Sequence, residues 1–196
     1  MPKRTIILIT LLTILTAALV MLAIRNEQNR QPVEESPRDS ISQETDVVKN
    51  AEMMFEPSAV VISSGSAQST VMVVIDTKDR SADGVQLELV YDPQALSNVT
   101  VTLPDNNFFG TASDAAVIVN SIDQERGRIS YWVGVNPDAL PSEGIGAIAE
   151  ISFIMNPVAP VNNTVIEIMD QSMITDGSLH TNILGKTSQL QIMRTQ

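Results

Sequence analysis

The chain has 196 residues, no cysteine and a formal net charge of −11 at pH 7. A chain of this length has room for one folded domain with appendages. The lack of cysteine excludes disulfides, thiolate metal sites and cysteine nucleophiles. The acidity argues against nucleic acid as a partner, because phosphate binding needs clustered Lys and Arg. We interpret the acidic residues mainly as a solubilising surface.

The N-terminus carries a long apolar segment. Lys3 and Arg4 precede an uncharged apolar run over residues 6–24, and Arg25 follows it. At about 1.5 Å per residue, a helix of this length approaches the roughly 30 Å of a bilayer core. Residues 1–25 therefore predict an uncleaved transmembrane signal anchor with the N-terminus in the cytoplasm. A cleaved signal peptide is the alternative, disfavoured because the run exceeds a usual h-region and ends without a small-x-small site. With either an anchor or a signal peptide, the rest of the chain would be exported.

A polar segment follows the anchor. Residues 26–52 are rich in Gln, Glu, Asn, Ser and Arg, and they show no apolar periodicity. Such a composition buries too little surface to offset the entropy lost on ordering. We expect a flexible stalk over 26–52, which would present an extracellular domain formed by residues 53–196.

The exported part shows many short apolar runs separated by turn residues. This pattern, without an amphipathic helix, is typical of an antiparallel β-sandwich or barrel. The predicted strands are 59–62, 70–75, 85–91, 98–103, 115–121, 128–135, 146–155, 165–169 and 189–193.

Two of these strands show clear alternation of inward and outward positions. Residues 85–91 and 128–135 place apolar residues at every second position. Because successive strand side chains point to opposite faces, one face should be buried and the other exposed. The outward positions of these two strands include Gln86, Glu88, Ser130 and Trp132.

The order of several short motifs resembles the cohesin family. The sequence has Tyr-Asp-Pro-Gln-Ala-Leu at residues 91–96, Val-Thr-Val at 99–101 and Asn-Phe-Phe at 107–109. Gly-Arg-Ile-Ser-Tyr-Trp follows at 127–132, and Gly-Ile-Gly-Ala-Ile-Ala-Glu-Ile-Ser-Phe at 144–153. The resemblance covers about residues 55–193.

The resemblance implies a nine-stranded jelly-roll β-sandwich, related to certain carbohydrate-binding modules. It also implies a non-catalytic role, in which one face of the sandwich grips a dockerin-like module of another protein at the cell surface. The residues of this candidate recognition face would be Gln86, Glu88, Ser130 and Trp132. Gly84 departs from the family, which commonly has a polar contact near this position. Polysaccharide binding by the same architecture and a structural role in the cell envelope are the alternative functions.

Trp132 is the most informative single residue of the candidate face. It is the only tryptophan, and alternation directs it opposite to Tyr131. An exposed tryptophan on a sheet is suited to anchoring a protein interface or stacking on a sugar ring. The competing interpretation is that a loop or neighbouring strand covers it. The exported part has few aromatic residues, which favours the protein interface.

Other polar residues give weaker signals. Asp76, Asp79 and Asp83 fall in a predicted hairpin, where carboxylates can bind calcium. Their spacing does not match an EF-hand, and a solvated turn is the preferred interpretation. His180 is the only histidine, and no nucleophile motif accompanies it, so we expect a surface residue. The sequence predicts no catalytic residues, no metal site and no cofactor.

Overall fold

The computed structural model of the chain describes residues 48–63, 68–111, 113–159 and 163–195. No helix within these ranges is long and apolar enough to cross a membrane. The predicted anchor of residues 1–25 and nearly all of the predicted stalk lie outside the described residues. Both therefore stay predictions.

All regular secondary structure in the described residues is β-strand, which confirms the predicted all-β class. Two predicted strands, 59–62 and 128–135, match β2 and β8 to the residue. The described ranges contain thirteen strands, where the resemblance implied nine. They are β1 (Ala51–Glu56), β2 (Ala59–Ile62), β3 (Gln68–Tyr91), β4 (Leu96–Thr102), β5 (Asn106–Asn107), β6 (Gly110–Thr111), β7 (Ala115–Asp123), β8 (Arg128–Val135), β9 (Ser142–Met155), β10 (Asn163–Ile168), β11 (Met173–Asp176), β12 (Leu184–Thr187) and β13 (Gln189–Arg194).

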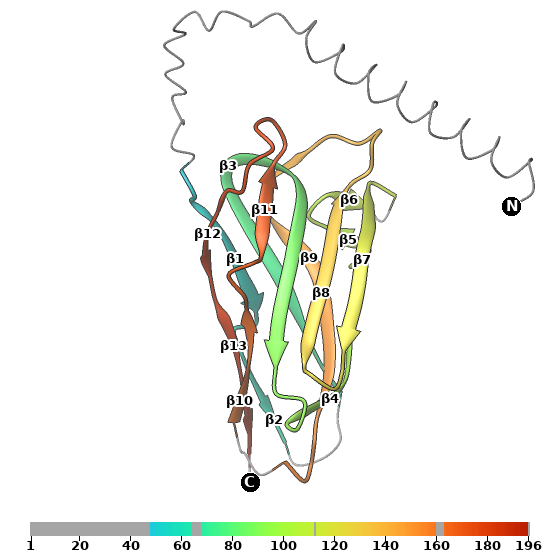
Figure 1. The fold of residues 1–196 in the computed structure, drawn as a ribbon, viewed down its shortest axis with the longest axis vertical. Coiled ribbons are helices and arrows are strands. Elements are labelled where there is room, and N and C mark those ends of the chain that lie inside the picture. Colours follow the sequence, from blue (N-terminus) through green and yellow to red (C-terminus); the bar gives the residue numbers. More distant parts are fainter. Residues whose placement is uncertain (1–47, 64–67, 112, 160–162, 196) are drawn as a thin grey trace, which may run out of the picture. The chain divides into compact units, whose positions relative to one another are not determined.

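The long strand β3 organises the whole domain. It runs for 24 residues, bends sharply, and contributes one half to each of two sheets (Figure 1). The bend lies near Lys78, whose φ is 58°, and the Asp76 Oδ1 atom accepts a hydrogen bond from the Lys78 backbone N–H at 2.9 Å. The predicted hairpin between 75 and 85 is therefore wrong, since the two halves of β3 pair with other strands and not with each other.

The two sheets follow from the partners of each half of β3. The first half lies between β1 and β9, with β4 beyond β9 and β12 beyond β1. The second half lies between β8 and the pair β10 and β11, with β7 beyond β8 and β13 and β2 beyond β10. The sheet that contains β7 and β8 is called the front sheet below.

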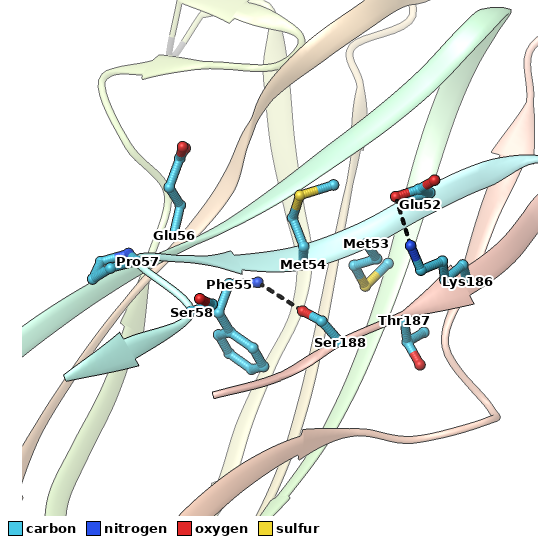
Figure 2. A pocket seen from close by; sticks show the side chains of 10 residues that line it. All are labelled: Glu52, Met53, Met54, Phe55, Glu56, Pro57, Ser58, Lys186, Thr187 and Ser188. Atoms are coloured by element: carbon cyan, nitrogen blue, oxygen red, sulfur yellow. Dashed lines mark hydrogen bonds and ion pairs between the residues drawn. The ribbon is translucent and has the colours of Figure 1, made fainter. Parts of the chain in front are cut away.

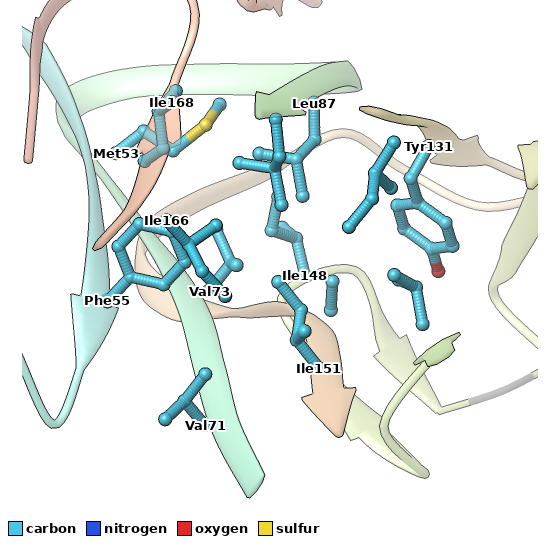
Figure 3. Packing of buried hydrophobic residues seen from close by; sticks show 14 of the residues in the cluster. Met53, Phe55, Val71, Val73, Leu87, Tyr131, Ile148, Ile151, Ile166 and Ile168 are labelled. Carbon is cyan, nitrogen blue, oxygen red and sulfur yellow. The ribbon is translucent and has the colours of Figure 1, made fainter. Parts of the chain in front are cut away.

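Apolar residues of both halves of β3 point into one core between the sheets. Val73 and Ile75 come from the first half and Leu87 and Leu89 from the second, and all four are at most 1 % exposed. Figure 3 shows Val73 and Leu87 packed with residues of β1, β8, β9 and β10. The predicted alternation of residues 85–91 and 128–135 is confirmed, because every second side chain in both strands is buried.

Tyr131 is a core residue with one unpaired polar atom. Its side chain is fully buried, and its hydroxyl has no hydrogen-bond partner among the described residues. Burial raises the pKa of Tyr131 to about 12, so the phenol stays neutral. An unpaired buried hydroxyl costs about 1–3 kcal/mol of desolvation.

We expect the Tyr131→Phe variant to be at least as stable as the wild type. Removing the unpaired hydroxyl leaves the ring in place and should raise the free energy of unfolding by about 1 kcal/mol. Urea denaturation followed by circular dichroism measures the change. A loss of more than about 1 kcal/mol would show that the hydroxyl has a stabilising partner.

A buried carboxylate fastens the loop after β11 to the bend of β3. The Arg80 Nε–H donates a hydrogen bond of 2.8 Å to one oxygen of the Asp176 carboxylate. The other oxygen accepts hydrogen bonds from the backbone N–H groups of Ser178 and Leu179, at 2.8 and 2.7 Å. Burial alone would raise the pKa of Asp176. The hydrogen bonds from Ser178, Leu179 and Arg80 outweigh burial and hold the pKa well below its usual value.

Because of the lowered pKa of Asp176, we expect the protein to lose stability in acid. Because the pKa of Asp176 is lower in the folded than in the unfolded state, its contribution is present above about pH 4 and disappears as the pH falls below that value. We expect the free energy of unfolding to fall by about 2 kcal/mol more in the wild type than in Asp176→Asn between about pH 5 and pH 2. Urea titrations at a series of pH values test this, and parallel profiles for the two proteins would contradict it.

Candidate functional site

The structure brings the four residues of the candidate recognition face together on the outer side of the front sheet. β3 and β8 are antiparallel neighbours, with Gln86 opposite Trp132 and Glu88 opposite Ser130. The buried neighbours of these residues fill the core, so alternation directs all four side chains outward. We call these four residues the recognition cluster.

The Glu88 carboxylate connects the members of the recognition cluster. Its Oε1 atom accepts hydrogen bonds from Gln86 Nε2 and Trp132 Nε1, each at 3.0 Å. Its Oε2 atom accepts the Ser130 hydroxyl at 2.6 Å. Hydrogen bonds to an ionised carboxylate are stronger than neutral ones. Glu88 therefore holds the side chains around it in fixed positions before any partner arrives.

Trp132 remains accessible within this arrangement. Its side chain is 38 % exposed, so the interpretation that a loop or strand of the described residues covers it is wrong. The indole nitrogen bonds to Glu88 while part of the ring stays open to solvent. An exposed aromatic ring held in one orientation loses little entropy when it enters an interface.

The backbone beneath Glu88 is fixed by a residue that sequence reasoning missed. The front sheet is interrupted between β10 and β11, and the buried Ser172 bridges the gap. Its Oγ atom accepts the Glu88 N–H at 3.0 Å and donates to the Glu88 carbonyl at 3.2 Å. Ser172 thus replaces the strand pairing that the interruption removes.

A shallow hollow of about 160 Å³ lies beside the recognition cluster. Gly84 and Gly134, which face each other across β3 and β8, leave the sheet bare of side chains there. The missing side chain at Gly84 is visible in the sequence, but the hollow itself is not. The hollow is lined by Gly84, Val85, Gln86, Ile118, Trp132, Val133, Met173 and Thr175.

A second hollow, of about 580 Å³, lies at the edge where β1 and the β12–β13 connection separate (Figure 2). The Phe55 N–H donates to the Ser188 Oγ at 3.3 Å across it. Two of its ionisable side chains, Glu52 and Lys186, pair with each other at 3.5 Å, and Glu56 also lines it. These contacts connect β1 to the segment of β12 and the β12–β13 connection, and none involves a residue of the recognition cluster.

The other predicted polar residues form no common site. Asp76 contacts Lys78, and Asp83 Oδ2 lies 3.3 Å from the His180 Nδ1. The three aspartates lie within the continuous strand β3 and not in a hairpin turn. His180 is exposed in the loop after β11, as expected. Within the described ranges, no group of three or more His, Asp or Glu side chains is placed to hold a metal ion.

The aromatic residues are distributed unevenly between the core and the surface. The four phenylalanines and two tyrosines are all buried, and only Trp132 reaches the surface. A flat sugar-binding platform uses two or more coplanar rings. Trp132 has no such companion, which weighs against the alternative of polysaccharide binding at this face.

Comparisons with known proteins were made for the sequence and for the structure. No protein-family model and no curated protein matches the sequence. The structure is similar to that of the cohesin CaCohA2 from Clostridium acetobutylicum, with 17 % identity, coverage of 76 % of this chain and 92 % of that chain, and a TM-score of 0.58.

Two further cohesins show the same likeness. The third cohesin of ScaC from Acetivibrio cellulolyticus, solved in complex with the ScaB dockerin, has 15 % identity, covers 75 % of this chain and 100 % of its own, and gives a TM-score of 0.60. A type II cohesin from the cellulosome of the same organism has 16 % identity, coverage of 74 % and 95 %, and a TM-score of 0.54. The described part of this chain therefore has a cohesin-like fold.

Proposed function

We propose that the domain is a non-catalytic docking module whose recognition cluster binds a dockerin-like module of another protein. The observation that carries the proposal is the arrangement around Glu88, which presents Trp132 on an open sheet surface in a fixed orientation. A partly exposed tryptophan next to polar groups is typical of an interface hot spot. The similar cohesins solved with dockerins support the choice of partner class.

The surroundings of the recognition cluster favour binding over catalysis. The hollow beside it is shallow, and its lining has no ionisable side chain. Catalysis usually needs convergent titratable groups in a water-excluding pocket. Glu88 is already engaged by three hydrogen-bond donors of its own chain, which suits a structural anchor of an interface.

The location of the module belongs to the same proposal. The apolar run of residues 6–24 would anchor the chain in a membrane, and the polar stretch after it would hold the domain outside the cell. A docking module placed in this way would tether its partner to the cell surface.

The proposal is tested by binding the full chain, purified in a mild detergent, to dockerin modules encoded in the same genome. Biolayer interferometry should find at least one module with a Kd of about 1 µM or tighter. A known cohesin with its own dockerin is the positive control. The proposal fails if the control pair binds and none of the modules does. Retention of the chain on cell-wall polysaccharide alone would instead support the carbohydrate alternative.

A further inference from the structure

The hollow beside the recognition cluster has a shape and a chemistry of its own. Its floor is backbone at Gly84, which carries no side chain and pairs with Gly134, a second glycine, on β8. Trp132 and Met173 line it from neighbouring strands, and Ile118 lines it from β7. Gln86 and Thr175 are the polar side chains of the lining, and the apolar side chains beside them leave room for a compact aliphatic group over the bare floor.

Ile118 belongs to the hollow because of a bulge in β7. The register of β7 against β8 shifts between Val117 and Val119, which leaves Ile118 as an extra residue. Its Cδ1 atom lies 3.5 Å from where a Cβ of Gly134 would be, so the side chain extends toward the glycine floor. The isoleucine is nevertheless 68 % exposed, so most of its apolar surface lacks a covering group.

The charge next to the hollow limits what can occupy it. Gln86 and Trp132 both line the hollow, and both donate to the same oxygen of Glu88. Within the described part of the chain, Glu88 makes no salt bridge with a Lys, Arg or His side chain. The anion is therefore complementary to a cationic group of an incoming partner.

From these observations we infer that the hollow is a specificity socket for one aliphatic side chain of the docking partner, flanked on that partner by a Lys or Arg that faces Glu88. This assignment rests on the proposed docking function and adds the identity of the contacted side chain. Gly84 is the residue that determines the specificity, because any side chain there would occupy the socket. The backbone at Gly84 is paired within the sheet, so Thr175 carries the one hydroxyl beside the floor, and an acidic side chain would also lie near the Glu88 carboxylate.

The substitution Gly84→Val closes the socket with little disturbance of the fold. A Cβ at position 84 meets only ordinary contacts, 3.9 Å from the Val133 carbonyl oxygen and 4.0 Å from the Thr175 Oγ1. Valine is also favoured in strands. Gln189→Val is the matched control, because it places the same side chain at an exposed position of β13, outside the socket. The thermal unfolding transition of each variant verifies folding.

The socket can be tested without a natural partner. The chain has a single tryptophan, so the indole N–H of Trp132 gives one NMR signal at the rim of the socket. The full chain in detergent is titrated with acetyl-Leu-Lys-amide, acetyl-Leu-Glu-amide and acetyl-Asn-Lys-amide. We expect a saturable shift with the first peptide, with a Kd on the order of 1 mM for a ligand of this size. The second should bind about threefold more weakly, because its carboxylate faces Glu88, and the third should give no saturable shift.

The same titration on the two variants shows whether the peptide binds in the socket. Gly84→Val should abolish the shift with acetyl-Leu-Lys-amide, whereas Gln189→Val should retain it. Equal shifts from the Leu and Asn peptides, or an unchanged shift in Gly84→Val, would overturn the socket.

If a dockerin that binds the wild type is found, its affinity for the variants tests the socket separately from the docking function. Gly84→Val should weaken it at least about tenfold. Equal binding to wild type and Gly84→Val would refute the socket and leave the docking function standing. Peptide binding as expected, with no dockerin bound, would refute the docking function alone.

Discussion

The Trp132→Ala variant should bind a dockerin module of the proposed kind about 100-fold more weakly than the wild type, as expected for a tryptophan at the centre of an interface. Two effects contribute to this loss. The substitution removes the exposed aromatic surface, and it takes away the indole N–H that helps to orient the Glu88 carboxylate. Biolayer interferometry on the full chain measures the change in Kd.

The matched control for this prediction is Ile145→Ala. Ile145 is 72 % exposed but lies on β9, in the sheet opposite the recognition cluster. Its truncation should change the affinity by less than about threefold. The hypothesis would fail if Trp132→Ala bound as well as Ile145→Ala, provided that both variants retain the thermal unfolding temperature of the wild type.

The Phe153→Ala variant should lose about 3–5 kcal/mol of unfolding free energy. Phe153 is a fully buried residue of β9, opposite Ser69 of β3. Removing its ring leaves a cavity in the core between the sheets, which the surrounding strands cannot fill completely. Urea denaturation followed by circular dichroism gives the value.

If Phe153→Ala is too unstable to purify, Phe153→Leu gives a smaller version of the same measurement, with an expected loss of about 1–2 kcal/mol. Ile145→Ala again serves as the surface control and should change stability by less than about 0.5 kcal/mol. A loss below about 1 kcal/mol in Phe153→Ala would contradict the packing of this core.

The sequence was sufficient to predict the parts of the structure that depend on a period of two. The alternation around Leu87 and Tyr131 identified both strands, and it placed Glu88 and Trp132 on the outer face. A half-buried strand allows only one assignment of its two faces, because a shift of one residue would exchange them. The composition of the recognition cluster was predictable for the same reason.

Long-range pairing was not predictable in this way. β1 was assigned to the predicted stalk and the first residues of the domain, yet it pairs with both β3 and β12 from Ala51 onward. The polar residues around Lys78 suggested a hairpin turn, but β3 bends there and its two halves pair with different strands instead of with each other. In both cases the partners are distant in the sequence, and tertiary pairing overrides the local preference.

The socket depends on features that local patterns do not show. The bulge that frees Ile118 arises from the register between β7 and β8. Met173 belongs to the four-residue strand β11, which is too short to give a periodic signal. Ser172, which fixes the Glu88 backbone, is an ordinary serine in the sequence and acquires its role only through the interruption of the sheet.

The most direct test of the account is to ask which face of the domain touches the partner. A photo-crosslinking amino acid is placed at position 118, beside Trp132 on the front sheet, or at position 145, on the opposite sheet. Both sites are well exposed, so each can carry the reagent without disturbing the core. The account predicts that irradiation of the complex links the dockerin to position 118 and not to position 145. Crosslinking through position 145, with none at position 118, would place the interface on the other sheet and contradict the central claim.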